Sequence, residues 1–207
     1  MDINGILLII LAFACLGLAG YAFYQYSLTQ SDPIFIVAVS LSTIGVSIFF
    51  GYLNVVHFGN TTLNVSWLWY IGSSIGLLFL FLSSVMASNE QFRLLRRWQI
   101  FATLLFFIII LLTPMFPASA DPLIPAVVSL ARPLICMCAF LRYASLYLAK
   151  ERRFSLVMSL AFLLLGVGFG VVTPQLLVPG LAVLGGVGSV LRITGYTTMI
   201  IAYTVIR

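Results

Sequence analysis

The sequence has few charged residues: only 7% of its 207 residues are charged, whereas 62% are hydrophobic. A soluble globular domain is about a quarter charged and about half apolar. Because so little charge cannot cover a water-facing surface, we expect most of the surface to face lipid. Long unbroken apolar runs, such as 104–112 and 156–165, lack the alternation of a membrane β-barrel strand. The composition therefore predicts an all-α integral membrane protein.

Cysteine and histidine are also scarce, with three cysteines and one histidine. Cys15, Cys136 and Cys138 lie in apolar runs, and an odd number there argues against a disulfide framework. On a helix, residues two apart point in different directions, which favours ordinary thiols over a soft-metal pair at Cys136 and Cys138. His57 alone cannot form a bis-histidine haem site or a typical zinc site. We therefore expect no metal and no cofactor, and interpret His57 as a plain loop residue, with pH sensing as the alternative.

Seven apolar segments are long enough to cross a membrane, which takes about 20 residues. Polar, proline and glycine residues separate these segments, and the short connections favour antiparallel packing of sequential helices. No connection is long enough for a soluble domain. The sequence thus predicts a single seven-helix transmembrane domain over 1–207, with helices at 5–26, 33–53, 66–87, 98–116, 124–148, 154–172 and 181–206.

The basic residues indicate the orientation of these helices. Segments 93–97 and 150–153 contain three basic residues each, and Arg207 follows the seventh helix. The connections after the second, fourth and sixth helices contain no lysine or arginine. The positive-inside rule therefore predicts an outside N-terminus and a cytoplasmic C-terminus in a cell membrane, plasma or inner. Because no basic stripe with interleaved aromatics is present, the net charge of +5 does not predict a nucleic-acid partner.

Arg192 is the most informative polar residue. It lies about eleven residues into the predicted seventh helix, which places it near mid-bilayer. Arginines at such depth are costly and usually face a bundle interior or a wet cavity. Gly188 and Tyr196 lie on the same helix face. The glycine leaves room for a ligand or a neighbouring helix, and the tyrosine offers a hydroxyl group.

Arg132 lies about eight residues into the predicted fifth helix, at a depth similar to that of Arg192. All five acidic residues are predicted to lie outside the helices, so neither arginine has an obvious counter-ion. One hypothesis is a ligand-binding site for an anionic group, formed by Arg192, Tyr196, Arg132 and Gly188. The other is structural, with each guanidinium bound to carbonyls, hydroxyls and water. The two are balanced for Arg192, whereas a structural or lipid-headgroup role is favoured for Arg132.

Small residues recur at 41–45 and 72–76, and again at 165–168 and 185–188. Helices rich in small residues look alike by composition, so we interpret this similarity as compositional rather than as a transporter-like internal repeat.

No catalytic residues are predicted. The helices contain no paired carboxylates, no convergent serine, histidine and acid, and no lysine in the seventh helix that could hold retinal. In size, odd helix count and outside N-terminus the chain resembles the seven-helix membrane modules of bacterial sensory proteins. Segments 68–72 and 191–196 are consistent with such modules, but the resemblance is architectural and implies no site residues.

These observations predict a non-enzymatic membrane module, sensory or accessory, that binds a ligand or partner protein. The expected partners are the lipid bilayer, an anionic or lipid-like small molecule, and a membrane or cytoplasmic protein. The alternative is a small transporter or channel for an anionic or amphipathic solute, which buried charge also supports. A membrane enzyme acting on lipids is the third hypothesis.

Overall fold

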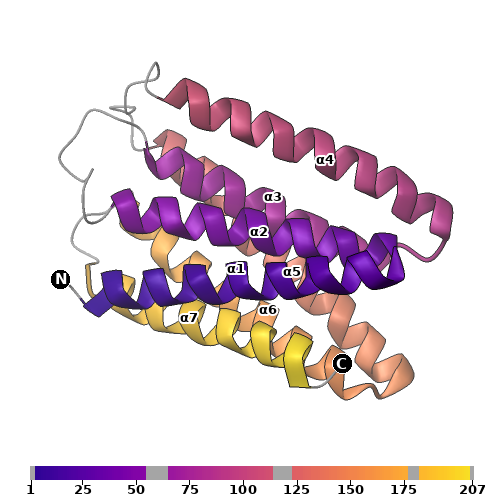
Figure 1. Cartoon of the computed structure of the whole chain (residues 1–207). Helices are drawn as coiled ribbons and strands as arrows, with labels where there is room; N and C mark the ends of the chain where they lie inside the picture. Colours follow the sequence, from indigo (N-terminus) through magenta and orange to yellow (C-terminus); the bar gives the residue numbers. More distant parts are fainter. Residues whose placement is uncertain (1–2, 55–64, 114–122, 177–181, 206–207) are drawn as a thin grey trace. The chain divides into compact units, whose positions relative to one another are not determined.

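The structure is a computed structural model that describes residues 3–54, 65–113, 123–176 and 182–205. Within these ranges all regular structure is helical, and six of the helices are long and apolar enough to cross a membrane (Figure 1). This confirms an all-helical chain and indicates a multi-pass membrane protein. The helices are α1 (Ile3–Thr29), α2 (Asp32–Leu53), α3 (Val65–Val85), α4 (Asn89–Leu112), α5 (Leu123–Lys150), α6 (Arg153–Val172), the short 3-10 helix η3 (Thr173–Leu176), and α7 (Ala182–Val205).

Most helix boundaries fall within three residues of their predicted positions, but the prediction for the start of α4 was wrong. Residues 88–97 were predicted to be a basic loop, yet α4 begins at Asn89. Ser88 caps it: its side chain accepts a hydrogen bond from Gln91 N at 3.3 Å, and Gln91 Oε1 accepts one from Ser88 N. This capping box holds the first turn of α4, so the basic residues of 93–97 are helical.

The helix α7 differs from the other six because it does not reach the hydropathy of a membrane span. Its 24 residues correspond to about 36 Å, which is long enough to cross a bilayer. Arg192 and the threonines at 194, 197, 198 and 204 lower its apolar content. Membrane spanning by α7 therefore stays a prediction.

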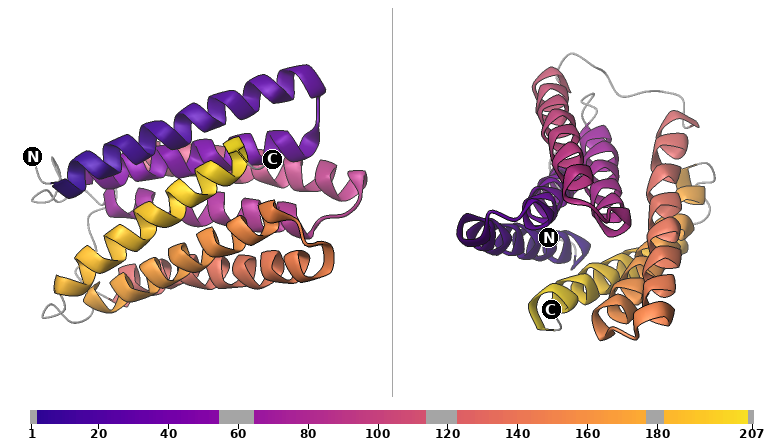
Figure 2. Two further views of the ribbon diagram at one scale, coloured as in Figure 1. Left: turned by 90° about the horizontal axis from the view of Figure 1, so that it is seen from below. Right: turned by 90° about the vertical axis from the view of Figure 1, so that its right-hand side faces the viewer.

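The chain divides into two compact units, residues 1–119 and residues 120–207. In the first unit α2 packs between α1 and α3, and α4 packs on α2 and α3 (Figure 1). In the second unit α6 packs between α5 and α7, and η3 contacts all three (Figure 2). Sequential helices are thus packing neighbours within each unit.

The ends of α1 and α5 have the same backbone conformation. Gln30, after α1, has φ 52°, and Glu151, after α5, has φ 49°; no other described non-glycine residue has a positive φ. This left-handed geometry commonly ends helices. Gln30 N donates to Tyr26 O at 2.8 Å, and Glu151 N donates to Tyr147 O at 2.7 Å. Positions 30 and 151 are 121 apart, as are positions 26 and 147.

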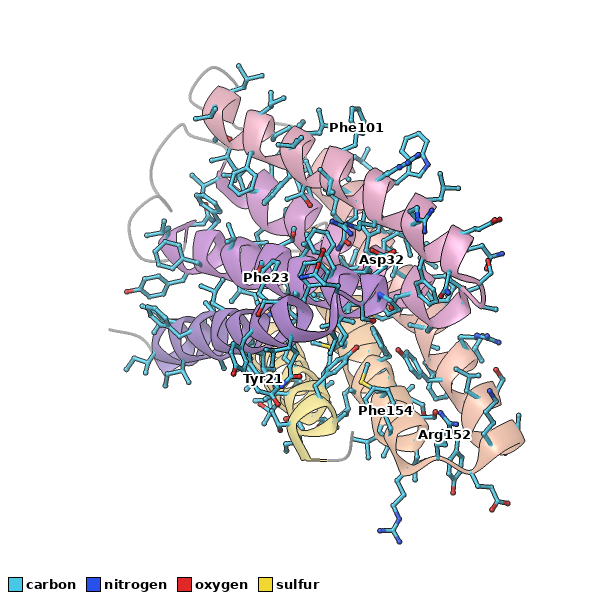
Figure 3. The ribbon with its side chains drawn as sticks, turned by 45° about the vertical axis from the view of Figure 1, so that its right-hand side comes forward. Tyr21, Phe23, Asp32, Phe101, Arg152 and Phe154 are labelled. Atoms are coloured by element: carbon cyan, nitrogen blue, oxygen red, sulfur yellow. The ribbon has the colours of Figure 1, made fainter. Side chains whose placement is uncertain are left out.

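The helices that follow these turns also begin alike. Ser31, before α2, has φ −85° and ψ 116°, and Arg152, before α6, has φ −77° and ψ 122°. Phe35 N donates to Ser31 O at 3.1 Å, and Leu156 N donates to Arg152 O at 3.3 Å. Figure 3 labels Arg152 beside the second of the two turns. Each pair is again separated by 121 positions.

The packing between helices repeats at the same spacing. A Cβ at Gly45 would lie 2.9 Å from Leu16 Cγ of α1, and a Cβ at Gly166 would lie 3.2 Å from Met137 Sδ of α5. Glycine thus permits a close helix approach at two positions that are 121 apart. Buried residues of α1 and α5 also coincide at this spacing: Leu11, Ala12, Cys15, Leu18 and Ala22 correspond to Arg132, Pro133, Cys136, Ala139 and Tyr143.

The third helices of the two units, α3 and α7, also correspond, but at a spacing of 119 residues rather than 121. A Cβ at Gly76 of α3 would lie 2.5 Å from Ile44 Cγ1, and a Cβ at Gly195 of α7 would lie 2.8 Å from Leu165 Cγ. Positions 44 and 165 are 121 apart, whereas 76 and 195 are 119 apart. The close contacts of α3 on α2 and of α7 on α6 are therefore equivalent.

Both units thus contain the same three-helix arrangement, α1–α3 in the first and α5–α7 in the second. This arrangement does not test the compositional interpretation of the small-residue segments, because only part of those segments falls in register. The matching register pairs Gly45 with Gly166 and Gly76 with Gly195, and it does not pair 72–76 with 185–188. The helix α4 has no counterpart among the described residues of the second unit.

Candidate functional site

A polar cluster lies between the three helices of the second unit. Its most buried member is Arg132 of α5, whose side chain is 2% exposed. Arg132 Nη2 donates to Ser129 Oγ at 2.7 Å. Ser129 Oγ in turn lies 3.3 Å from Thr173 Oγ1, at the end of α6. The guanidinium is therefore bound into a chain of hydroxyl groups that connects α5 to α6.

Arg192 belongs to α7, the other helix that packs on α6, and its side chain reaches the same region. Its Nε donates to Gly188 O at 3.2 Å, and its Nη2 donates to Ser189 Oγ at 3.0 Å. These bonds to a carbonyl and a hydroxyl match part of the structural hypothesis for intramembrane arginines. Its stem packs on α6, since a Cβ at Gly168 would lie 2.9 Å from Arg192 Cγ.

The ring of Phe169 on α6 brings the two arginines together. Arg132 Cζ lies 4.5 Å from the ring centroid, and Arg192 Cζ lies 5.7 Å from it. Tyr196 packs on the same ring edge-to-face, with 6.5 Å between centroids. Both arginine positions are within cation–π range of one buried aromatic side chain. The structure therefore brings the predicted residues Arg132, Arg192, Tyr196 and Gly188 to one place.

Both guanidinium groups point toward the helix ends where α5 and α7 begin. Arg132 bonds three residues back, and Arg192 bonds three and four residues back, as expected from side chains that lean toward a helix N-terminus. Ser129 and Ser189 lie six and seven residues after the starts of α5 and α7, or about 10 Å. The mid-bilayer depth predicted for Arg192 therefore applies to its backbone. Its guanidinium group lies one turn nearer the start of α7.

The C-terminal end of α6 contributes favourable electrostatics to this cluster. Phe169 and Thr173 belong to its last turn and its C-cap. The carbonyl groups at a helix C-terminus carry about half a negative charge, which favours a nearby cation. This dipole offsets part of the cost of placing Arg132 in a buried site, although it does not neutralise two positive charges.

The first unit holds apolar residues at three of the equivalent positions, whereas the counterpart of Arg192 at the 119-residue spacing is Ser73, a buried polar residue. Leu11 corresponds to Arg132, Ile48 to Phe169 and Leu77 to Tyr196, and all three first-unit residues are buried. At this level the first unit therefore packs aliphatic side chains and Ser73, whose hydroxyl donates to Trp69 O at 2.6 Å, while the second unit packs two arginines around an aromatic ring. Because Leu11 packs at the place of Arg132, helix packing at this level does not require Arg132.

A smaller polar cluster joins α4 to α2 in the first unit. Arg96 Nη1 lies 2.8 Å from Asp32 Oδ1, at the start of α2, and its Cζ lies 4.6 Å from the ring of Phe35. Gln99, 1% exposed, donates to Ile36 O and to Ser40 Oγ, each at 2.9 Å. These contacts hold α4 against α2, and Figure 3 labels Asp32 at this junction.

The sequence interpretation found the two arginines but missed several of their partners. Phe169, Ser129, Thr173 and Ser189 were not predicted as site residues. Ser129 and Ser189 each lie three residues before an arginine, and that spacing was the available signal. Phe169 lies in an apolar run, where an aromatic residue usually indicates only core packing.

Other residues considered from the sequence lie apart from this cluster. Cys15 and Cys136 are buried free thiols, and Cys138 is an exposed one. His57 lies outside the described residues. Among the residues that the structure describes, no three histidine, cysteine or acidic side chains gather as a metal site would require.

The chain was also compared with known proteins. It matches no protein-family model, no curated protein and no solved structure.

Proposed function

We propose that this chain is a non-enzymatic membrane module that binds an anionic group at the Arg132–Phe169–Arg192 cluster. The supporting observation is the contrast between the two units. The three-helix arrangement packs with Leu11, Ile48 and Ser73 in the first unit, but contains two guanidinium groups around one ring in the second. Burying a charge costs several kcal/mol. Because helix packing at this site does not need the charge, we infer that the charge serves another purpose.

The chemistry of the cluster favours a phosphate or carboxylate on an amphipathic molecule. Guanidinium groups bind these anions through paired, charge-assisted hydrogen bonds. The helix α5 is 28 residues or about 42 Å long, so it extends past a hydrocarbon layer of about 30 Å. Charges about 10 Å from its start therefore lie near the boundary where headgroups begin. A ligand with an acyl chain and an anionic head fits that depth.

The membrane arrangement belongs to this proposal. The helix α7 crosses the membrane as the seventh span, the N-terminus is outside and the C-terminus is cytoplasmic. The segments 93–97 and 150–153, at the start of α4 and around the α5–α6 turn, support this orientation through their basic residues. The anion site then lies toward the outer face of a plasma or inner membrane.

A small transporter is the second candidate, and the repeated three-helix arrangement favours it. Many secondary transporters consist of structural repeats that sequence similarity barely reveals. In that case the same cluster would hold an anionic or amphipathic solute in transit. Uptake of the bound molecule into sealed vesicles would distinguish transport from binding alone.

The test uses the full chain in neutral maltoside micelles and dodecyl phosphate as the probe. We expect the probe to raise the thermal unfolding midpoint of the unsubstituted protein. Arg132→Leu and Arg192→Leu should each lose this shift, because one charged hydrogen-bonded partner is worth about 1.5–3 kcal/mol, or about ten- to a hundredfold in affinity.

The matched control is Arg153→Leu, which removes an exposed arginine at the start of α6. This variant should keep the full shift. Equal shifts in all four proteins would mean that the probe acts through general charge, and the proposal would be wrong. Loss of the shift together with a large fall in the probe-free midpoint would assign the arginines to structure.

A further inference from the structure

The helix α4 is attached to the first unit through polar as well as apolar contacts. Gln99, which is 1% exposed, donates through Nε2 to Ile36 O and to Ser40 Oγ of α2, each at 2.9 Å. Phe106, two turns further along α4, packs closely on α3. Residues 99, 103 and 106 follow helical spacings of four and three, so Thr103 lies on the same face of α4, between these two contacts.

Two oxygen atoms on this face of α4 are buried without a hydrogen-bond partner. They are Oε1 of Gln99 and Oγ1 of Thr103, and neither forms a hydrogen bond with any group that the structure describes. Buried polar atoms in folded proteins almost always have a partner, because leaving one without a bond costs as much free energy as losing a hydrogen bond. Two such atoms one turn apart on a helix therefore indicate a common partner.

Thr103 differs in this respect from the other described threonines. In all of them the hydroxyl group donates to the carbonyl group four residues back, at positions 29, 43, 113, 173, 194, 197, 198 and 204. This bond is a common way for a threonine within a helix to satisfy its hydroxyl group. Because Thr103 does not form it, its hydroxyl group is available to a partner outside the α4 backbone.

The hydroxyl group of Ser40 serves the contact with α4 rather than the packing of α2 on α3. Ser40 O lies 2.8 Å from the Cβ position of Gly76 on α3, and at the equivalent place in the second unit Ala161 O lies 3.0 Å from that of Gly195. Alanine therefore permits the same close approach of helices. The serine hydroxyl, 0% exposed, is present in the unit that contains α4, and it is bonded to α4 through Gln99.

We propose that a water molecule is bound between α4 and α2, where it donates to Gln99 Oε1 and accepts from the hydroxyl group of Thr103. Buried waters typically make about three hydrogen bonds to otherwise unsatisfied polar groups. Ser40 Oγ provides a further polar group on the α2 side. All three groups are neutral, which favours water over an ion, since a buried ion needs charged or fully coordinating partners. The site involves neither arginine of the proposed anion site, so the two proposals fail independently.

The substitution Thr103→Val tests the site, because valine resembles threonine in shape and lacks only the hydroxyl group. With the water bound, the change removes a hydrogen bond and should raise the unfolding equilibrium constant about two- to tenfold. Without the water, the change removes an unsatisfied hydroxyl group and should lower that constant. Reversible unfolding of the full chain in mixed micelles, followed by circular dichroism, measures the direction.

The matched control is Thr43→Val, the same change at a threonine of α2 that is 4% exposed. The hydroxyl group of Thr43 donates to Val39 O of its own helix at 2.8 Å, so its removal should change the constant by about twofold or less. A fall in the constant for Thr103→Val, or a rise no larger than that of the control, would overturn the proposal.

Magnetisation transfer from water detects the bound molecule directly. The full chain, with ¹⁵N in its glutamine side chains, is studied in lipid vesicles by solid-state NMR. Gln99 is buried, so its amide group should receive magnetisation only from a water bound beside it. We expect one glutamine signal to receive it in the unsubstituted protein and in Thr103→Ser, which keeps the hydroxyl group, and to lose it in Thr103→Val. The same transfer to every glutamine signal in all three proteins would refute the water site.

Discussion

At the scale of single residues, Arg132 shows how a membrane interior accommodates a guanidinium. Water is replaced by the hydroxyl of Ser129, at 2.7 Å, and by the face of Phe169, at 4.5 Å. Neither partner removes the charge, so both reduce the cost of burial without eliminating it. The proposed anion site is built on this guanidinium, held by a hydroxyl group and an aromatic face.

The equivalence of Arg132 and Leu11 leads to a reciprocal prediction. In the absence of ligand, Arg132→Leu should leave the thermal midpoint unchanged or raise it, because leucine packs at the equivalent place in the first unit and a buried charge is removed. The reverse change, Leu11→Arg, should lower it strongly, since it introduces a charge into an apolar layer at a cost of at least a few kcal/mol. Thermal unfolding in detergent, followed by circular dichroism of the helices in both units, measures both.

The contradicting result is a fall of several degrees for Arg132→Leu. That outcome would mean that the hydroxyl chain from Ser129 to Thr173 depends on the guanidinium. The structural hypothesis for the intramembrane arginines would then explain the cluster completely.

Among the helices, close approach at glycine determines which pairs pack tightly. Gly195 of α7 lies against α6, where a Cβ would come 2.8 Å from Leu165 Cγ and 3.0 Å from Ala161 O. The carbonyl belongs to the helix backbone and cannot move aside. We therefore expect Gly195→Ala to push α7 away from α6 and to destabilise the protein by about 1–3 kcal/mol.

Gly186 provides the control on the same helix. A Cβ there would meet no described heavy atom within 4 Å. Gly186→Ala should be neutral or stabilising by up to about 1 kcal/mol, since alanine favours helix more than glycine does. Chemical or thermal unfolding of the two variants compares them, and equal destabilisation would disprove the close approach of α7.

Helix positions were largely predictable because apolar runs of about 20 residues are a strong signal. The start of α4 was not, because the three arginines of 93–97 were interpreted as a loop. Ser88 and Gln91 carried the correct signal, a capping box. The repeat was not visible in the sequence because few residues are identical at the matching positions. Cys15 with Cys136 and Gly45 with Gly166 are two of the identical pairs. Packing conserves shape and burial more than residue identity.

For the whole molecule, the proposed topology places the α3–α4 and α5–α6 turns on the cytoplasmic side. Cysteines introduced one at a time at Ala87 and Glu151, both exposed, should react with a membrane-impermeant maleimide only after cells are permeabilised. The background is Cys138→Ser. Labelling of either cysteine in intact cells would contradict the orientation, and labelling of only one would contradict the helix count between them.

Among the described residues α4 has no counterpart in the second unit, and this has a consequence for the membrane orientation of the two three-helix segments. A segment with three crossings ends on the side opposite to its start. If two such segments were fused directly, the second would begin from the wrong compartment, and its Glu151 turn would emerge opposite the Gln30 turn. One additional crossing restores the parity, so that under the proposed topology both left-handed turns reach the cytoplasm. Under the proposed topology α4 is therefore the connector that lets both three-helix segments cross the membrane in the same direction.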